Sequence, residues 1–210
     1  MKCGASLVVA LLLLLNGTNV GAVELVVSVQ ASGAAASLSD SDPSIGGEVP
    51  LGIGGGASAS IAVRIAERFA VGLCARIGTY GHLDESASRT YETSVVLPSL
   101  GVLTRLELPF SLSATLFLGY DHGSIFSHIK QDSIDFSSDN DLNGFATTLE
   151  AAYRLELGLQ FPLLLELGPT LGLNLLSQND AVFDGATYPD DHLTLYWTFG
   201  LFAQATYELR

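Results

Sequence analysis

Apolar and polar residues alternate with a period of two along much of the chain, most clearly between Phe161 and Leu175. In this segment every odd position is apolar, whereas the even positions are mostly glycine or polar. Successive side chains of a strand point to opposite faces, so the segment predicts a strand with one apolar wall. Its glycines and prolines disfavour a helix. It is longer than the roughly 5–6 residues usual in soluble sheets, and it is long enough to cross a bilayer as a tilted strand.

The same alternation recurs in seven other segments, which predicts eight strands. Their ranges are 25–32, 58–65, 69–79, 94–108, 110–120, 144–156, 161–175 and 193–209. Long connections at 33–57, 80–93, 121–143 and 176–192 alternate with short ones at 66–68, at Pro109 and at 157–160. Bacterial outer-membrane barrels have an even number of antiparallel strands, short periplasmic turns and long extracellular loops. We therefore expect an all-β, eight-stranded antiparallel up-and-down transmembrane β-barrel, with four long extracellular loops and both termini in the periplasm.

The charged residues inside the predicted strands all fall on the polar wall. They are Arg64, Arg76, Arg105, Glu107, Glu150, Arg154, Glu156, Glu166 and Glu208. A Lys or Arg facing lipid at the bilayer midplane would cost about 2–4 kcal/mol, so this wall is expected to face the lumen. Eight strands enclose an interior that side chains nearly fill, which excludes a wide channel. We expect these charges to form ion pairs across the lumen, with Arg76 and Glu150 at a similar depth.

A soluble lipocalin-type barrel has the same alternation, but it turns the polar wall toward water. Here that wall is mostly Gly, Ala, Ser and Thr, and beyond residue 22 the chain has a single lysine, Lys130. The composition therefore favours a barrel that faces lipid. The formal net charge of −13 disfavours nucleic acid as a partner.

The first residues have the pattern of a secretory signal peptide. Lys2 precedes a short apolar run from Leu7 to Leu15, and small residues, Gly21 and Ala22, follow. We expect residues 1–22 to be removed and residues 23–210 to form the barrel in the bacterial outer membrane. Cys74 is then the sole cysteine, which excludes an internal disulfide.

The arrangement of a signal, eight alternating strands and four long loops resembles the small outer-membrane barrels of the OmpA/OmpX, opacity-protein and OmpW groups. The stretch Val96-Leu-Pro-Ser-Leu-Gly-Val-Leu103 is similar to the Leu-Pro-Pro-Thr-Leu stretch of OmpW-like proteins, although it has one proline. The chain also ends Tyr-Glu-Leu-Arg210, where such barrels usually end in an aromatic residue. Resemblance to the OmpW group implies passage of small hydrophobic molecules. Resemblance to the other groups implies adhesion or membrane integrity.

Two functions are thus expected as alternatives for a monomeric barrel. In the first, Val95, Leu97, Phe117 and Tyr196 line an apolar upper pocket above an ionic floor. A small hydrophobic ligand would leave this pocket sideways into the outer-membrane lipid past Pro98, which cannot donate a ladder hydrogen bond. In the second, the protein is an adhesin or membrane-integrity barrel whose acidic loops bind a host or surface ligand.

The third long loop matches the calcium-loop pattern from Asp139 to Glu150. Asp139, Asp141 and Asn143 supply oxygen atoms at alternate positions, as calcium requires. The flanking segments are predicted as loop and strand rather than as the helices of an EF-hand. A partial calcium site and an acidic, solvated loop therefore stand as alternatives, and no other cofactor is expected.

The chain is not expected to be an enzyme. Its four histidines, His82, His122, His128 and His192, all lie in or beside predicted loops, the last after Asp190-Asp191. No Ser-His-Asp arrangement can be placed from their spacing.

Overall fold

The computed structural model describes residues 24–40, 48–85, 89–131, 134–157, 162–183, 186–188 and 193–209. The predicted signal peptide lies outside these residues. The strands are β1 (Glu24–Asp40), β2 (Glu48–Ala66), β3 (Phe69–Glu85), β4 (Arg89–Leu108), β5 (Leu112–Gln131), β6 (Ile134–Glu156), β7 (Leu163–Phe183), β8 (Ala186–Tyr188) and β9 (Leu193–Leu209). Within the described ranges, no helix is long and apolar enough to cross a membrane.

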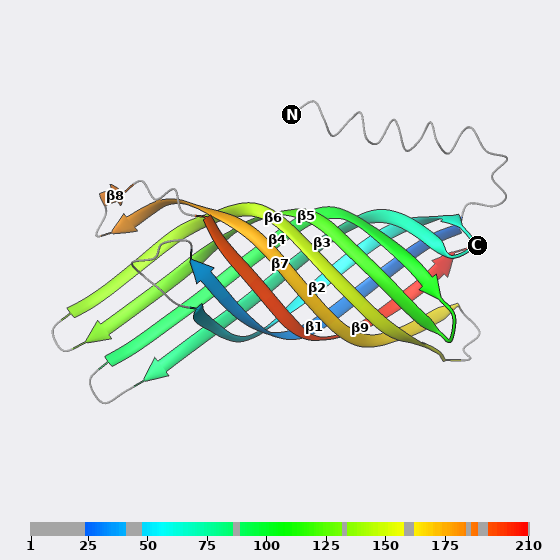
Figure 1. Ribbon diagram of the computed structural model, residues 1–210, viewed down its shortest axis with the longest axis horizontal. Helices are drawn as coiled ribbons and strands as arrows, with labels where there is room; N and C mark the ends of the chain where they lie inside the picture. The colour runs from blue at the N-terminus through cyan, green and yellow to red at the C-terminus, as the bar shows by residue number, and fades with distance from the viewer. Residues whose placement is uncertain are drawn as a thin grey trace, which may run out of the picture.

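Eight of these strands form a closed antiparallel barrel (Figure 1). Each strand from β1 to β7 pairs with the next, and β9 pairs with both β7 and β1. The three-residue β8 pairs only with the far end of β7 and is not part of the ring. The eight-stranded antiparallel barrel predicted from the sequence is confirmed.

The two ends of the barrel differ. Short connections join β2 to β3 and β4 to β5 at one end, which we call the turn end; Glu24 and Leu209 lie at the same end. At the opposite end, which we call the hairpin end, the β3–β4 and β5–β6 hairpins extend past the other strands (Figure 1).

The two faces of each strand are as the alternation predicts. On β9 the even-numbered side chains are buried and the odd-numbered ones are exposed or half-buried. On β7, Thr170 is 7% exposed, whereas its neighbour Leu171 is 46% exposed. The polar wall therefore faces the lumen and the apolar wall faces outward.

The four long loops predicted from the sequence are wrong in extent, because most of their residues continue the strands. Residues 33–40, 48–57, 80–85, 89–93, 121–131, 134–143 and 176–183 are all strand. Only residues 86–88 separate β3 from β4, and only residues 132–133 separate β5 from β6. In these extensions most outward positions of β5 and β6 are polar, while Ile125 and Leu142 face inward, so the apolar-outward alternation ends although the backbone pairing continues.

The turn between β4 and β5 is longer than predicted. Phe110 and Ser111 belong to it with φ angles of 65° and 58°, and β5 begins at Leu112. Because these left-handed φ values cannot continue a strand, the pairing of the two strands ends at Leu108 and Leu112.

Candidate functional site

An ionic cluster closes the lumen near the turn end. Arg64 contacts the carboxylates of Glu24, Glu107 and Glu208, each at 2.7 Å. Arg154 contacts Glu107 at 2.8 Å and reaches Glu208 at 3.6 Å. Two guanidinium groups are thus interleaved with three carboxylates, so each charge placed in this narrow interior faces an opposite one.

A second ion pair, Arg105–Glu166, lies deeper in the lumen. Nη1 and Nη2 of Arg105 donate to the two carboxylate oxygens of Glu166, both at 2.6 Å. Ser113 donates to the same carboxylate at 2.8 Å, and Gln204 and Thr206 each donate at 3.0 Å. Glu166 is 1% exposed. The carboxylate therefore accepts five hydrogen bonds, which compensate for its removal from water.

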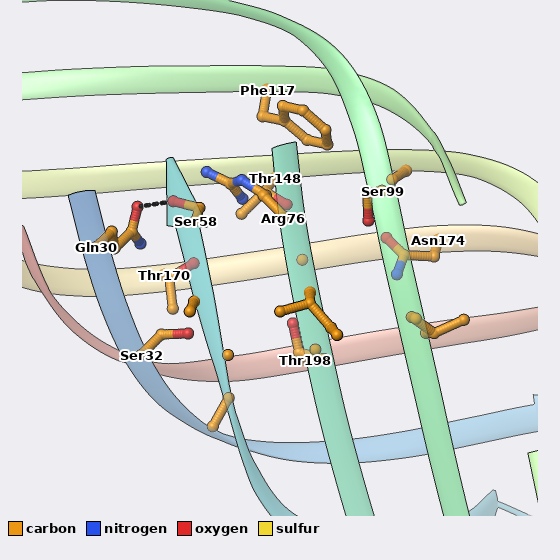
Figure 2. Close-up of a pocket in the computed structure, with 18 of the residues that line it drawn as sticks. Gln30, Ser32, Ser58, Arg76, Ser99, Phe117, Thr148, Thr170, Asn174 and Thr198 are labelled. Atoms are coloured by element: carbon orange, nitrogen blue, oxygen red, sulfur yellow. Dashed lines mark hydrogen bonds between the residues drawn. The ribbon is translucent and has the colours of Figure 1, made fainter. Parts of the chain in front are cut away.

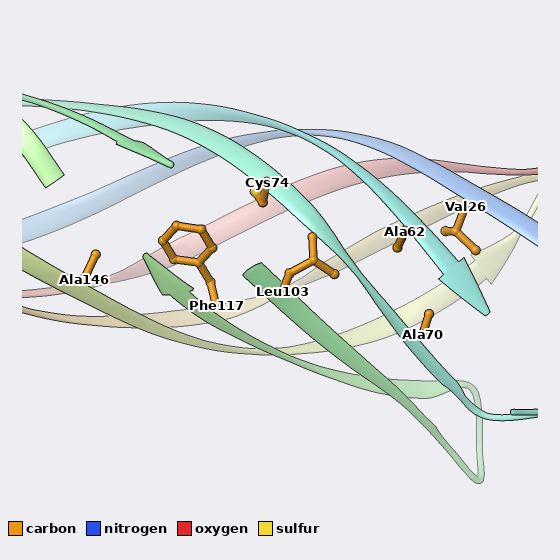
Figure 3. Close-up of a cluster of buried hydrophobic side chains, with 7 residues drawn as sticks. All are labelled: Val26, Ala62, Ala70, Cys74, Leu103, Phe117 and Ala146. Carbon is orange, nitrogen blue, oxygen red and sulfur yellow. The ribbon is translucent and has the colours of Figure 1, made fainter. Parts of the chain in front are cut away.

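The predicted contact between Arg76 and Glu150 is present, with Nη2 of Arg76 2.6 Å from Oε1 of Glu150. Gln30 donates to the same oxygen at 3.0 Å. The guanidinium of Arg76 also lies over the ring of Phe117, 4.5 Å from its centroid. Phe117 belongs to a buried apolar cluster along the lumen (Figure 3), with Val26, Ala62, Ala70, Cys74, Leu103 and Ala146.

Above the Arg76–Glu150 pair lies a cavity of about 80 Å³. Its lining mixes polar and apolar side chains, and every strand of the ring contributes to it (Figure 2). Besides Arg76 and Glu150, the polar side chains that line it are Gln30, Ser32, Ser58, Ser99, Thr148, Thr170, Asn174 and Thr198. Leu97, Phe117 and Tyr196 also line the cavity. Leu97, Phe117 and Tyr196 of the predicted pocket therefore do line a common cavity, but hydroxyl and amide groups share the lining with them.

An apolar cluster, which we call the apolar cap, lies on the hairpin-end side of the cavity. It consists of Ala36, Val95, Leu97, Leu142, Leu176 and Tyr196, with Tyr80 and Ile125 packed against it. Val95 does not line the cavity but is buried in this cap, with 1% exposed. The predicted order of an apolar pocket above an ionic floor thus becomes ionic cluster, polar cavity and apolar cap.

Pro98 faces outward, as predicted, at a break in the barrel wall. The β4–β5 ladder runs to Val96–Ser124 and resumes at Ser99–Asp121 in the same register, which leaves Pro98 unpaired with β5. The β6–β7 ladder has a similar break beside Pro169. Both breaks follow from the missing N–H of proline, so the break at Pro98 is not unique.

Two residues of the predicted ion-pair set are placed differently from the rest. Glu156 is exposed where β6 ends, and no ion pair of Glu156 is present among the described residues. Arg105 pairs with Glu166 rather than with the turn-end cluster.

The sequence did not identify all residues of the lumen network. The prediction missed Glu24, which falls just before the predicted first strand, and the neutral partners of Glu166. Each of these residues occupies a position of the polar wall in the alternating pattern, and this position was the signal that could have identified them.

The candidate calcium ligands do not converge. Asp139, Asp141 and Asn143 lie along β6, where residues on one face are roughly 6.6–6.8 Å apart. Calcium needs its oxygen atoms at about 2.3–2.6 Å, which three such positions cannot supply together. The pattern's last residue, Glu150, faces the lumen and binds Arg76 instead. The extended conformation of β6 thus favours the alternative of an acidic segment without bound calcium, and the calcium site stays a prediction.

The histidines are dispersed. His82 lies on β3, whereas His122 and His128 lie on β5. His128 Nε2 is 2.8 Å from Asp135, and His122 contacts Asn143. His192, Asp190 and Asp191 lie outside the described residues. No group of three or more His, Cys, Asp or Glu side chains in the described part of the chain is arranged to hold a metal ion.

Comparison with known proteins places the chain by its fold. No protein-family model matches the sequence, and no curated protein matches it significantly. Among solved structures, a major outer membrane protein from Thermus thermophilus aligns with a TM-score of 0.51 and 14% identity, over 90% of this chain and 100% of that one. Ail, the attachment invasion locus protein of Yersinia pestis, aligns with a TM-score of 0.48 and 10% identity, over 85% of this chain and 97% of that one. The chain has the fold of a small eight-stranded outer-membrane β-barrel.

Proposed function

We propose that the protein is a surface-binding barrel of the bacterial outer membrane, in which the barrel is a closed anchor and the extended β3–β6 strands bind a partner outside the cell. The observation that carries this proposal is the change in the outward face along these strands. On β5 the outward residues are apolar from Leu112 to Tyr120, and beyond Tyr120 they are polar or charged at His122, Ser124, His128 and Lys130, with Phe126 as the apolar exception. The apolar stretch matches the about 9–11 residues that cross a bilayer.

The same change occurs on the neighbouring strands. On β6 the outward residues are apolar or Thr up to Phe145 and polar or acidic from Asn143 to Asp135. Phe145 packs edge-on against Tyr120, with ring centroids 6.1 Å apart, at the level where the change takes place. Such paired aromatic rings suit the membrane–water interface. We define the projecting sheet as residues 82–85, 89–94, 122–131 and 134–143, which continue these strands beyond this level.

The outward side of the projecting sheet is acidic. Its exposed carboxylates, which we call the acidic face, are Glu85, Glu92, Asp135, Asp139 and Asp141. The basic side chains described on this side are Lys130 and the histidines of β5. A partner of opposite charge fits such a surface best, so we propose that the protein binds a basic protein surface, as a monomer and without catalysis.

A trimmed barrel tests this proposal. Gly81 pairs with Ser94, and Gly123 pairs with Leu142. Replacing residues 82–93 and 124–141 each by Asn-Gly therefore closes both hairpins with two-residue turns that preserve the register. Decalysine serves as the probe for a basic partner, and its binding to the barrel in lipid nanodiscs is measured by surface plasmon resonance. We expect the trimmed barrel to lose binding.

Charge neutralisation is the finer experiment. Changing the five residues of the acidic face to Gln or Asn should weaken decalysine binding about tenfold or more, because each exposed ion pair contributes roughly 0.2–1 kcal/mol. The matched control is Glu67→Gln with Glu156→Gln, which removes two exposed carboxylates at the turn end. The proposal is wrong if the trimmed barrel binds as well as the full chain, or if the turn-end control weakens binding equally.

A lateral conduit for small hydrophobic molecules is the second candidate, and the break in the ladder beside Pro98 favours it. Leu97, a member of the apolar cap, and Phe117 line the cavity at this level, so a solute that crossed the cap would contact both before reaching the break. The hydroxyl and amide groups in the lining of the cavity count against this function, because an apolar solute gains little from contact with them.

Uptake of a hydrophobic fluorescent probe into liposomes tests the conduit. Leu97→Asp and Phe117→Asp should each reduce uptake, and Pro98→Val should slow it by restoring the ladder. The matched control is Pro169→Val, which restores the other break away from the cavity rim. Uptake that is unaffected by the first three changes, or is slowed equally by Pro169→Val, would exclude this route.

A further inference from the structure

The acidic face contains one exposed aromatic ring, that of Phe126 on β5, which is 39% exposed. Phe126 is one of two large apolar side chains exposed on the described part of the projecting sheet, and the other is Leu83 on β3. In ladder register Phe126 lies between Ser94 of β4 and Asp139 of β6. Aromatic side chains are enriched where proteins bind partners, so the surroundings of this ring indicate what it would contact.

Two carboxylates lie beside the ring. Asp139 is opposite Phe126, and Asp141 is the next residue on the same face of β6, opposite Ser124. Both aspartates are exposed, and neither forms an ion pair with any residue that the structure describes. Opposite residues of an antiparallel pair are about 4.5–5.5 Å apart and diagonal ones about 7–8 Å, so both carboxylates can contact a group that lies over the ring.

The basic side chains of the same face have partners of their own. On one side of the ring, His128 Nε2 is 2.8 Å from Asp135, and Lys130 is opposite Asp135 in register. On the other side, His122 contacts Asn143. No cation of the described residues therefore lies between the ring and the two carboxylates beside it.

The lumen contains the same combination of groups with a cation in place. There the guanidinium of Arg76 lies 4.5 Å from the centroid of the Phe117 ring, and its Nη2 is 2.6 Å from Glu150. Glu150 is two residues beyond the β6 position opposite Phe117. Asp141 is likewise two residues beyond the β6 position opposite Phe126. The two strands thus repeat one register offset between an aromatic ring and a carboxylate, and the repeat in the lumen holds a guanidinium.

We propose that Phe126, Asp139 and Asp141 form a binding site for one arginine side chain of the partner, an inference that rests on the proposed function. A guanidinium is planar, so it can stack on the ring while it donates two hydrogen bonds to a carboxylate. A lysine ammonium is a compact and strongly hydrated charge, so it gains less from an exposed ring. The site therefore distinguishes an arginine-bearing partner from one that is merely basic.

The test compares decaarginine with decalysine on the barrel in lipid nanodiscs at one ionic strength. Both probes carry the same charge, so the ratio of their dissociation constants removes the general attraction of the acidic face. We expect decaarginine to bind the wild type more tightly, and Phe126→Leu to lower this preference about two- to fivefold, because the stacking is lost. Leu83→Ala, which removes the other exposed apolar side chain, is the matched control and should keep the preference.

A second measurement detects the arginine itself. The probe is a peptide of nine lysines with one central arginine, and its δ-methylene protons should shift upfield in the NMR spectrum when they lie over the ring. Asp139→Asn with Asp141→Asn should remove most of this shift. The matched control is Glu85→Gln with Glu92→Gln, which removes the same charge from β3 and β4 and should leave the shift in place. The gel mobility of unboiled samples checks that each variant is folded.

The inference is overturned if Phe126→Leu leaves the preference for decaarginine unchanged, or if Leu83→Ala lowers it equally. It is also overturned if the arginine protons of the bound probe do not shift. In each of these cases decalysine still binds the barrel, so the proposed function stands without the arginine site. If neither decalysine nor decaarginine binds the wild type, the proposed function and the arginine site both fail.

Discussion

Glu166→Gln is expected to destabilise the barrel by about 3–5 kcal/mol, the largest effect predicted for any single lumen residue. The change keeps the shape of the side chain but removes the charge opposite Arg105, which is 5% exposed. The guanidinium then remains buried with one neutral oxygen in place of a bidentate carboxylate. The amide NH₂ of glutamine would also face the donors of Ser113, Gln204 or Thr206.

Urea unfolding in detergent, followed by the gel mobility of unboiled samples, measures this loss. Glu156→Gln is the matched control and should change the free energy of unfolding by less than about 0.5 kcal/mol, because Glu156 is exposed. The double variant Arg105→Gln/Glu166→Gln should recover part of the loss, with a coupling energy of roughly 0.5–3 kcal/mol. A strictly additive double variant would contradict the view that the two charges compensate each other.

The alternation of side chains made the lumen largely predictable. A charged residue on a lipid-facing wall is costly, so the alternation of the two walls alone assigned Arg76, Glu150 and Glu166 to the interior. The Arg76–Glu150 contact was also within reach, because two charges at similar depth in a narrow barrel must meet. The prediction that Glu156 forms a lumen ion pair failed because the alternation does not indicate where a strand ends and its side chains become exposed to solvent.

The extent of the hairpins could not be predicted by the same reasoning. The alternation indicates a face in contact with lipid, and it ends where the outward residues become mostly polar, as between His122 and Gln131 on β5. Backbone pairing does not need that contrast, so the strand continues where the pattern stops. The calcium-loop pattern has a related limit: its oxygen-bearing residues have the spacing of a loop, whereas Asp139 and Asp141 lie in an extended strand.

The lining of the cavity and the surroundings of Asp121 depend on the register between strands. The sequence indicates which residues of a strand face inward, but not which residues of neighbouring strands lie side by side. Only the observed register places Asp121 beside Ser99 on one side and Gly144 on the other. The apolar cap likewise assembles residues from strands far apart in the chain, such as Ala36 and Leu142.

The orientation of the barrel wall leads to the second large effect. Leu171→Arg should destabilise the folded protein by about 2–4 kcal/mol, because Leu171 faces outward near the middle of the apolar band. Its neighbours in register on that face, Leu149 and Phe199, are apolar and exposed, so they offer a guanidinium no partner. Thr170→Arg places the same charge one residue away in the lumen, where Thr170 lines the polar cavity near Glu150. This variant should be tolerated better.

Unfolding free energies of both variants in lipid vesicles give the comparison, and a third variant adds the dependence on depth. Leu175 faces outward at the level of Phe145, where the apolar band ends on β6. Leu175→Arg should therefore cost only about 0–1 kcal/mol, because its guanidinium can reach the interface. Equal losses for Leu171→Arg and Thr170→Arg would show that the two faces of β7 are not distinguished by lipid. Equal losses for Leu171→Arg and Leu175→Arg would place the edge of the membrane beyond Phe145, and thus within the sheet proposed to bind a partner.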